Sequence, residues 1–262
     1  QTTESGKKRI VSLTSLSTDI IRNISPEKLV GIPDSSLFKK SEDLKLIRRV
    51  SKGRTPPNIE NIIELKPDLV IGSNGFHDKV LSRFNSMGIE TLSYEVRNLY
   101  QLEKFINTLD LIVNGRNTNI LEKIKSEEIN RCLVSSDTLS KGSNNIVVLA
   151  SIKPILSPNS LSWSGNLLDR FNLNNLTKDL ESKSQFKGYV NLSSEWIIKS
   201  NPDKIIIIET SKDQYKEFGE DTFWSNLKAV KNNNVYKFDY YGMINPGSLS
   251  SINNTCKKLN QI

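Results

Sequence analysis

The chain has 262 residues, which is enough for two hydrophobic cores, because single domains typically contain about 100 to 150 residues. No stretch approaches the roughly 20 consecutive apolar residues that a membrane-spanning helix needs, so we expect a soluble chain. The formal net charge of +7 and the pI near 9.2 are compatible with nucleic-acid binding, but the basic residues are scattered and are not interleaved with aromatic residues. We therefore expect no nucleic-acid partner.

The first part of the chain alternates short β-rich runs with helical patterns. Residues 1–8 are small and polar and are typical of a tether or a processed end. Strands are predicted at 9–13, 29–32, 69–71 and 89–94, with a helix beginning near Ser17 and another ending at Met87. Residues 37–50 have no clear period and are left unassigned.

One pattern occurs in both halves of the sequence. The segments ENIIELKPDLVIG (60–72) and EWIIKSNPDKIIII (195–208) both read as Glu, any residue, Ile-Ile, three residues, Pro-Asp, any residue and a β-branched run. The residue before a proline is pushed out of the α region, so a helix ends there and a buried parallel strand follows. One copy in each half predicts two α/β lobes of the same plan.

A longer helical pattern separates the two copies. Apolar residues recur at helical spacing from Leu99 to Val113, Asn114-Gly115 interrupts them, and a second periodic stretch follows. We expect residues 115–141 to form one helix of about 25 residues, about 37 Å long, that bridges the two lobes. The predicted fold is therefore α/β, with an N-terminal lobe (9–114) and a C-terminal lobe (142–262), each a mainly parallel sheet flanked by helices.

The C-terminal lobe is predicted to open with a strand at 146–150, followed by a Pro- and Ser-rich loop and a helix at 163–171. After the second copy of the pattern, a strand at 235–238 and a loop at 239–247 lead to a closing helix that ends near Leu259. Cys132 and Cys256 are too few for a disulfide framework or a zinc–thiolate site, and they either form one bridge in an oxidising compartment or remain two buried thiols.

The sequence lacks the usual combinations of catalytic residues. His77 is the only histidine, there is no GxGxxG or GxxxxGK loop, and any Ser-His-Asp set would have to use His77. We therefore expect no enzymatic activity.

The order of the motifs resembles the substrate-binding proteins of iron-chelate, haem and vitamin B12 ABC importers. The matching segments span nearly the whole chain and are RIVSL, LVGI, PNIENIIELKPDLVIG, MGIET, SSEWIIKSNPDKIII and FWSNLKAVKNNNVYKFD. The resemblance implies a monomeric, exported periplasmic or extracytoplasmic protein with its signal peptide removed and no intrinsic cofactor. It also implies that a cobalt or iron complex (cobalamin, haem or a ferric siderophore) is captured between the lobes and delivered to a membrane permease. The alternative is an interaction or sensor protein that keeps the fold without transporting a ligand.

The same resemblance implies a docking role for two acidic residues. In the vitamin B12-binding members of the family, one acid on each lobe meets arginines of the permease, and these positions correspond to Asp78 and Glu195. Both lie at predicted helix starts, so the alternative is that each is a surface acid that stabilises the helix dipole.

The ligand cleft is predicted to be formed by loops that follow the carboxyl ends of strands, because open α/β sheets bind ligands there. The candidate residues are Ser15, Ser17, Arg54, Asn58, Ser73, Asn74, Phe76, His77, Trp163, Tyr189, Glu209, Tyr240 and Tyr241.

Several of these residues have two possible roles. Tyr189 corresponds to a cleft tryptophan of the vitamin B12 binders, so it either stacks on a flat macrocycle or packs within its lobe. The other cleft tryptophan corresponds to Ser73, which weakens a corrinoid assignment. His77 is either an axial ligand of iron or cobalt or an ordinary loop histidine, and Tyr240 and Tyr241 are alternative axial ligands.

The roles of two further residues and of the cysteines also have alternatives. Trp163 either faces the ligand or starts a core helix, and Arg54 either pairs with an anionic chelate or caps the Pro-Pro turn. Cys256 matches a cysteine of the family whose bridge partner corresponds to Phe171, so the family disulfide does not transfer to this chain.

Overall fold

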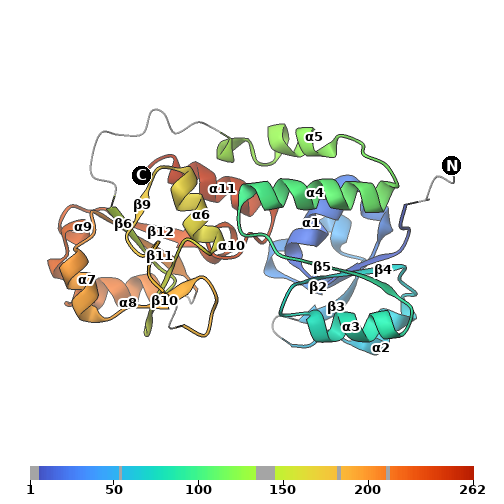
Figure 1. The fold of residues 1–262 in the computed structure, drawn as a ribbon, viewed down its shortest axis with the longest axis horizontal. Helices are drawn as coiled ribbons and strands as arrows, with labels where there is room; N and C mark the ends of the chain where they lie inside the picture. The colour runs from blue at the N-terminus through green and yellow to red at the C-terminus, as the bar shows by residue number, and fades with distance from the viewer. Residues whose placement is uncertain (1–5, 53–54, 134–144, 182–183, 211–212) are drawn as a thin grey trace. The chain divides into compact units, whose positions relative to one another are not determined.

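The structure is a computed structural model that describes residues 6–52, 55–133, 145–181, 184–210 and 213–262. The chain divides into two compact units, each with its own parallel sheet (Figure 1). Unit 1 contains the described residues up to Val96, together with Tyr100–Ile129 and Gly247–Leu249. Unit 2 contains those of Arg97–Leu99, Asn130–Pro246 and Ser250–Ile262.

Unit 1 is built on a five-stranded parallel sheet with the strand order β3-β2-β1-β4-β5. Its strands are β1 (Ile10–Ser12), β2 (Leu29–Asp34), β3 (Arg48–Lys52), β4 (Leu69–Ser73) and β5 (Glu90–Tyr94). Its helices are α1 (Ser15–Ile24), α2 (Ile59–Glu64), α3 (Asp78–Ser86), α4 (Leu99–Asn114) and α5 (Ile120–Glu127), with short 3-10 turns η1 (Pro26–Lys28), η2 (Ser36–Phe38) and η3 (Glu42–Leu44).

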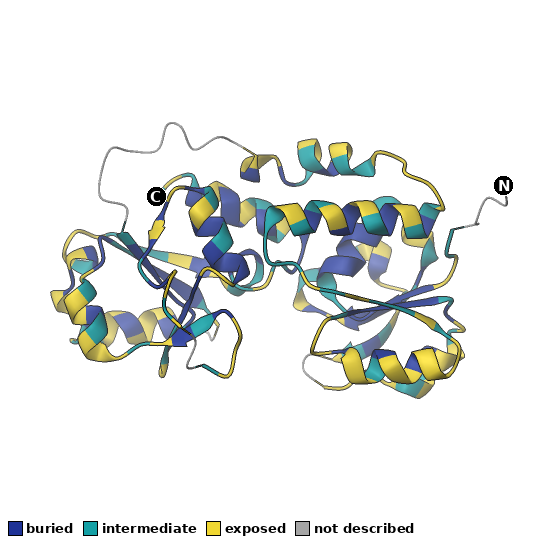
Figure 2. Cartoon of the chain, viewed as in Figure 1, coloured by how far each residue is buried: buried dark blue, intermediate teal, exposed yellow. Residues whose placement is uncertain are grey.

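The helices of unit 1 cover both faces of its sheet. Figure 1 shows α2 and α3 on one face and α1 and α4 on the other. The core on the α2 and α3 side contains Val11, Leu13, Val50, Ile62, Val70, Leu81 and Phe84. Figure 2 shows the buried residues concentrated in the strands and on the inward sides of the helices, as expected for two-sided packing.

Unit 2 contains a four-stranded parallel sheet in the order β12-β11-β6-β9 and a three-stranded antiparallel sheet in the order β10-β8-β7. The strands are β6 (Asn145–Leu149), β7 (Ser151–Ile152), β8 (Ile155–Pro158), β9 (Asn174–Asn175), β10 (Tyr189–Asn191), β11 (Lys204–Glu209) and β12 (Val235–Asp239). The helices are α6 (Trp163–Arg170), α7 (Ser194–Ser200), α8 (Gln214–Glu220), α9 (Lys228–Lys231), α10 (Tyr240–Met243) and α11 (Leu249–Leu259), with turns η4 (Asn130–Cys132) and η5 (Trp224–Asn226).

Both copies of the repeated pattern fold as predicted. In the first copy, α2 ends at Glu64 before Pro67, and the strand β4 follows. In the second copy, α7 ends at Ser200 before Pro202, and β11 follows. The predicted α/β fold with mainly parallel sheets flanked by helices is confirmed.

Two local differences from the sequence prediction have clear causes. The strand β2 runs through Pro33 to Asp34, beyond the strand predicted at 29–32, because its register with β3 shifts between Ile32 and Pro33 and so accommodates a residue without an N–H donor. The expected Pro- and Ser-rich loop contains the hairpin of β7 and β8, which turns at Lys153-Pro154.

Within the described part of the predicted helix, residues 115–133, the chain does not form one continuous helix. The helix α5 ends at Glu127, the turn η4 follows, and 134–144 lie outside the described residues. Cys132, at the end of η4, is disulfide-bonded to Cys256 in α11, with a Cα–Cα distance of 5.0 Å, so the bridge holds η4 against α11. A bridging helix between the lobes stays a prediction. Within the described residues, every helix is too short or too polar to cross a membrane.

Candidate functional site

In unit 1 the candidate site lies where the strand order changes direction. From β1 the chain first adds β2 and β3 on one side and then β4 and β5 on the other, so the loops after β1 and β4 leave the same edge of the sheet at its switch point. Such a point is where open α/β sheets bind ligands. The two loops contain Ser15, Ser17 and the predicted residues 73–77.

The loop after β1 is held by a network of hydroxyl groups. The Ser17 Oγ lies 2.6 Å from the Oγ of Ser12 and 2.6 Å from the Oγ1 of Thr14, which in turn lies 2.5 Å from the Tyr94 hydroxyl. Ser17 is fully buried, so in this structure it is a structural residue and not the ligand contact that we expected. The partly exposed Ser15 donates to the Ser35 Oγ at 3.0 Å and stays at the edge of the sheet.

His77 closes the turn between β4 and α3. Its backbone N–H donates to the Ser73 carbonyl at 3.0 Å, and its Nδ1 lies 3.0 Å from both the backbone N and the Oγ of Ser73. The strand β1 pairs with β4 only as far as Ile71, so the Ser73 N–H lies beyond the last pair and uses the imidazole as its acceptor. Burial leaves His77 5% exposed and lowers its pKa, while the charge of Asp78 opposes that shift.

This geometry fixes the tautomer of the neutral imidazole. A backbone N–H can only donate, so Nδ1 must be the unprotonated nitrogen and Nε2 must carry the proton. A metal ligand needs a free lone pair, and in this arrangement neither nitrogen offers one. The arrangement therefore supports the loop-histidine alternative, although the residue is buried and not on the surface.

The other predicted residues of unit 1 are spread along its loops. Asn74 is exposed, and Phe76 is 60% exposed with its ring at right angles to that of His77. Asn58 is exposed and caps α2 by accepting a hydrogen bond from the Asn61 N–H at 3.0 Å. Arg54 lies outside the described residues.

In unit 2, α6, α10 and the strand β10 together form an aromatic cluster. Trp163, at the start of α6, donates from Nε1 to the Gly242 carbonyl at 2.8 Å, and Ser164 donates to the Met243 carbonyl at 2.5 Å. The Ser164 side chain is also hydrogen-bonded to the hydroxyl of Tyr189. Trp163 is 4% exposed, so the structure supports its role in the core of the unit.

The tyrosines of this cluster remain partly exposed. Burial raises the pKa of Tyr189 to about 12, so its phenol stays protonated at neutral pH and can donate a hydrogen bond. The rings of Tyr240 and Tyr241 lie 5.3 Å apart at 76°. Glu209, at the end of β11, is engaged by Lys237 at 2.5 Å and so is already paired.

Both predicted docking acids are exposed in the first turn of a helix. Asp78 begins α3 and accepts a hydrogen bond from the Ser93 hydroxyl at 3.4 Å. Glu195 follows Ser194 in α7, whose cap residue Ser193 accepts from the Trp196 N–H at 3.1 Å.

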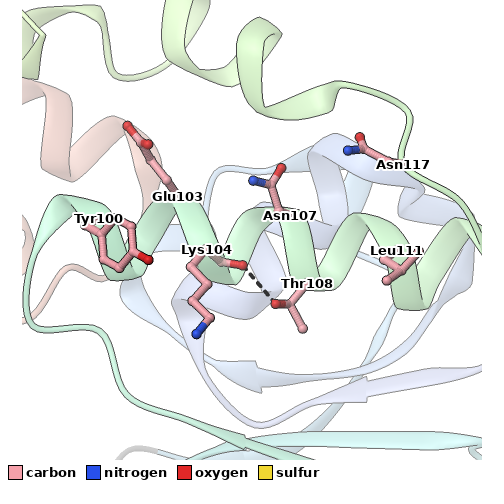
Figure 3. Close-up of a pocket in the computed structure, with 7 residues that line it drawn as sticks. All are labelled: Tyr100, Glu103, Lys104, Asn107, Thr108, Leu111 and Asn117. Carbon is pink, nitrogen blue, oxygen red and sulfur yellow. Dashed lines mark hydrogen bonds between the residues drawn. The ribbon is translucent and has the colours of Figure 1, made fainter.

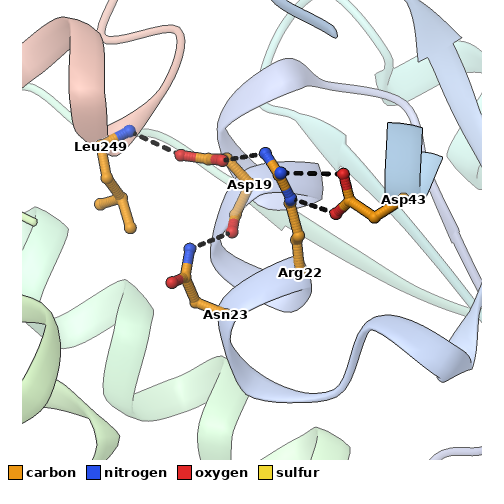
Figure 4. Close-up of polar contacts among 5 residues, drawn as sticks. All are labelled: Asp19, Arg22, Asn23, Asp43 and Leu249. Carbon is orange, nitrogen blue, oxygen red and sulfur yellow. Dashed lines mark hydrogen bonds and ion pairs between the residues drawn. The ribbon is translucent and has the colours of Figure 1, made fainter. Parts of the chain in front are cut away.

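A buried carboxylate that the sequence did not single out lies on α1. The Asp19 Oδ2 accepts a hydrogen bond from the N–H of Leu249, the first residue of α11, at 2.8 Å (Figure 4). Arg22 lies 3.8 Å from Asp19 and 2.5 Å from Asp43. Burial is the main cause that raises the pKa of Asp19, and the Leu249 hydrogen bond opposes it.

A cavity of about 460 Å³ lies along α4, and none of the predicted site residues lines it (Figure 3). It is lined by Tyr100, Glu103, Lys104, Asn107, Thr108, Leu111 and Asn117. Tyr100 and Leu111 are exposed on its rim, and we assign it no ligand.

Comparison with known proteins defines the class to which this fold and these sites belong. The family model described as periplasmic binding protein matches residues 10–241, which covers most of both units, so the chain belongs to that family.

Three relatives illustrate the similarity. The chain is 27% identical to the Fe(3+)-citrate-binding protein YfmC of Bacillus subtilis over 248 residues, which cover 91% of this chain and 76% of the relative. It is 25% identical to the high-affinity heme uptake system protein IsdE of Staphylococcus aureus over 255 residues, covering 91% and 82%. The crystal structure of an ABC transporter substrate-binding protein from Listeria monocytogenes has the same fold, with a TM-score of 0.77, 23% identity and coverage of 97% and 98%.

Proposed function

We propose that this chain is the extracytoplasmic solute-binding component of an ABC importer and that it binds a metal chelate or a tetrapyrrole. The observation that carries the proposal is the match of the periplasmic binding protein family over residues 10–241. The functions for which YfmC and IsdE are named, Fe(3+)-citrate binding and heme uptake, support an iron complex as the ligand. The Cys132–Cys256 bridge supports an oxidising compartment outside the cytoplasm.

The proposed ligand contacts come from the carboxyl edge of each parallel sheet and from Tyr189 at the start of β10. In unit 1 they are the partly exposed Ser15 and Ser73 and the exposed Asn74, and in unit 2 they are Tyr189, Tyr240 and Tyr241. Tyrosine rings stack on flat apolar surfaces, and their hydroxyls bond to polar substituents of a chelate. The protein holds its ligand through these contacts and delivers it unchanged, so no catalytic step is assigned to it.

Titration of the purified protein followed by visible spectroscopy tests this function. We expect hemin, cobalamin or a ferric siderophore to shift the absorption spectrum with saturation at a ratio of one ligand per chain. Tyr189→Ala should weaken binding by about tenfold, because one aromatic contact contributes about 0.5–1.5 kcal/mol beyond its buried area. Tyr100→Ala on α4 is the matched control and should bind normally. A flat response to all three ligands contradicts ligand binding and favours an interaction or sensor protein.

We also propose that Asp78 and Glu195 dock the protein on its permease. Both carboxylates are exposed in the first turn of a helix in separate units, where they are accessible to arginines of a partner. The double reversal Asp78→Lys with Glu195→Lys should leave ligand affinity unchanged and abolish uptake in a transport assay. Uptake that survives both reversals contradicts the docking role.

A further inference from the structure

Each proposed docking acid has a large exposed apolar side chain close to it in the sequence. Phe76 precedes Asp78 by two residues and is 60% exposed, and Ile198 follows Glu195 by three residues and is 58% exposed. Single exposed apolar residues are common on protein surfaces. The same combination at both docking acids, on separate units, indicates a shared use.

Phe76 is exposed although it is held in place. Its ring lies edge-on to the His77 imidazole with a centroid distance of 4.8 Å. His77 is fixed in turn by its contacts with Ser73 and by its close approach to Gly72, where an added Cβ would lie 2.7 Å from the His77 Cβ. A side chain that is already ordered loses little conformational entropy when a partner covers it.

Ile198 is presented by a well-anchored helix. Its neighbour Ile197 is buried in the core of unit 2, and Trp196 packs against the same core. Residues three apart lie on the same side of a helix, so Glu195 and Ile198 share the outward side of α7. The helix therefore presents an acid and an apolar group together.

The two carboxylates are also available to a cationic partner. In the part of the chain that the structure describes, neither Asp78 nor Glu195 takes part in an ion pair. Protein interfaces typically combine a few desolvated apolar anchors with charged groups around them. Each acid with its apolar neighbour has this composition.

We infer that Phe76 and Ile198 are apolar anchors of the permease-docking surface, each entering an apolar pocket beside a cationic residue that pairs with Asp78 or Glu195. The inference rests on the proposed docking function and adds two residues to it. It moves Phe76 from the ligand-contacting set to the permease-contacting set. The acids orient the two proteins and raise their association rate, whereas the apolar groups buried in the interface slow dissociation.

Binding of the full-length protein to its permease, reconstituted in lipid nanodiscs, tests this inference. Phe76→Ser and Ile198→Ser should each raise the dissociation constant by about tenfold, mainly through faster dissociation. The matched control is Leu46→Ser, because Leu46 is 96% exposed in the segment between η3 and β3 and has no docking acid next to it. This control should bind the permease like the unmodified protein. Thermal unfolding confirms that all variants are folded.

A double-mutant cycle links each apolar group to its acid. The combined effect of Phe76→Ser and Asp78→Asn should differ from the product of the single effects, because residues that contact one partner site couple. If the acid variants weaken docking and the serine variants do not, the apolar anchors are refuted while the docking acids stand. If no variant has an effect, both are refuted, and a protein that fails to bind the permease refutes the proposed function as well.

Two other uses of these side chains give different results. If Phe76→Ser weakens binding of hemin, cobalamin or ferric siderophore and leaves docking unchanged, Phe76 is a ligand contact and the inference is overturned. If the unmodified protein is a dimer in light scattering and Phe76→Ser or Ile198→Ser makes it monomeric, the exposed groups serve self-association, and the inference is again overturned.

Discussion

His77 is the residue whose role depends most on a single hydrogen bond. As the only histidine of the chain, it is the only possible imidazole ligand for a metal. The donor at Ser73 is a backbone N–H, which reserves the Nδ1 lone pair for the protein itself. The position of His77 in the sequence could not reveal this hydrogen bond. The Ser73 N–H needs a side-chain acceptor only because the pairing of β1 with β4 ends at Ile71.

The stability that His77 contributes should depend on pH. Burial lowers the pKa of His77 below 6.5, so the contribution is present above pH 6.5 and is lost as the pH falls through the folded-state pKa. His77→Phe keeps a ring but removes the acceptor, and it should lower the free energy of unfolding by about 1–3 kcal/mol at pH 8. Urea unfolding at pH 8 and pH 5 should show this difference shrinking in acid. An unchanged difference contradicts the assigned hydrogen bond.

Asp19 should show the opposite pH behaviour. Its pKa is raised above 3.8 by burial, so its charge lowers stability at neutral pH and this cost disappears as the pH falls through the folded-state pKa. Asp19→Asn keeps an oxygen for the Leu249 N–H and removes the buried charge, whereas Asp19→Ala loses the acceptor.

The alanine variant should therefore be less stable than the asparagine variant by about 1 kcal/mol, as for the loss of a helix cap. Urea unfolding at pH 7 measures this difference. The unmodified protein should gain stability relative to Asp19→Asn as the pH is lowered, because protonation relieves the cost of the charge. Equal stability of the two variants contradicts the capping role.

At the scale of the elements, the repeated Pro-Asp pattern was the most reliable guide. The helix–strand pairs α2–β4 and α7–β11 both form where the pattern predicted them. A proline ends a helix because its ring clashes with the preceding turn and because it pushes the residue before it out of the α region. The helix starts at Asp78 and in front of Glu195 were also found from the sequence. These features depend on residues within one or two turns of each other.

The turn η4, which follows α5, is held by a distant part of the chain. Cys132 and Cys256 are 124 residues apart, and their bridge fixes η4 against α11 together with the hydrogen bond from the Arg131 N–H to Asn253 at 2.9 Å. Apolar periodicity could not show this, because it carries no information about which cysteines meet.

Reduction of the bridge should lower the free energy of unfolding by about 2–4 kcal/mol, because the closed loop is long. Chemical unfolding with and without reductant measures the difference. The variant Cys132→Ala with Cys256→Ala is the control, since it should resemble the reduced protein and not respond to reductant. Identical unfolding midpoints of the oxidised and reduced protein contradict this prediction.

For the whole molecule, ligand binding should appear as thermal stabilisation. A ligand present at about 100 times its dissociation constant stabilises the folded state by about 2.7 kcal/mol, which corresponds to a rise in Tm of about 5–10 °C. Differential scanning fluorimetry with hemin, cobalamin and ferric siderophore measures the shift. The variant Asp78→Lys with Glu195→Lys should show the same shift, and its loss would place the acids in the ligand site.

The sequence by itself determined the α/β plan, the two copies of the helix-Pro-Asp-strand unit and the positions of the exposed acids. Proline stereochemistry, capping and apolar periodicity act over a few residues, so they can be seen without a fold. Only the tertiary structure decided that Ser17 and Trp163 are buried, that His77 bonds to Ser73, and that the cysteines are bridged. Each of these depends on which strand ends, helices and loops pack together, and that information is not contained in any local stretch of the chain.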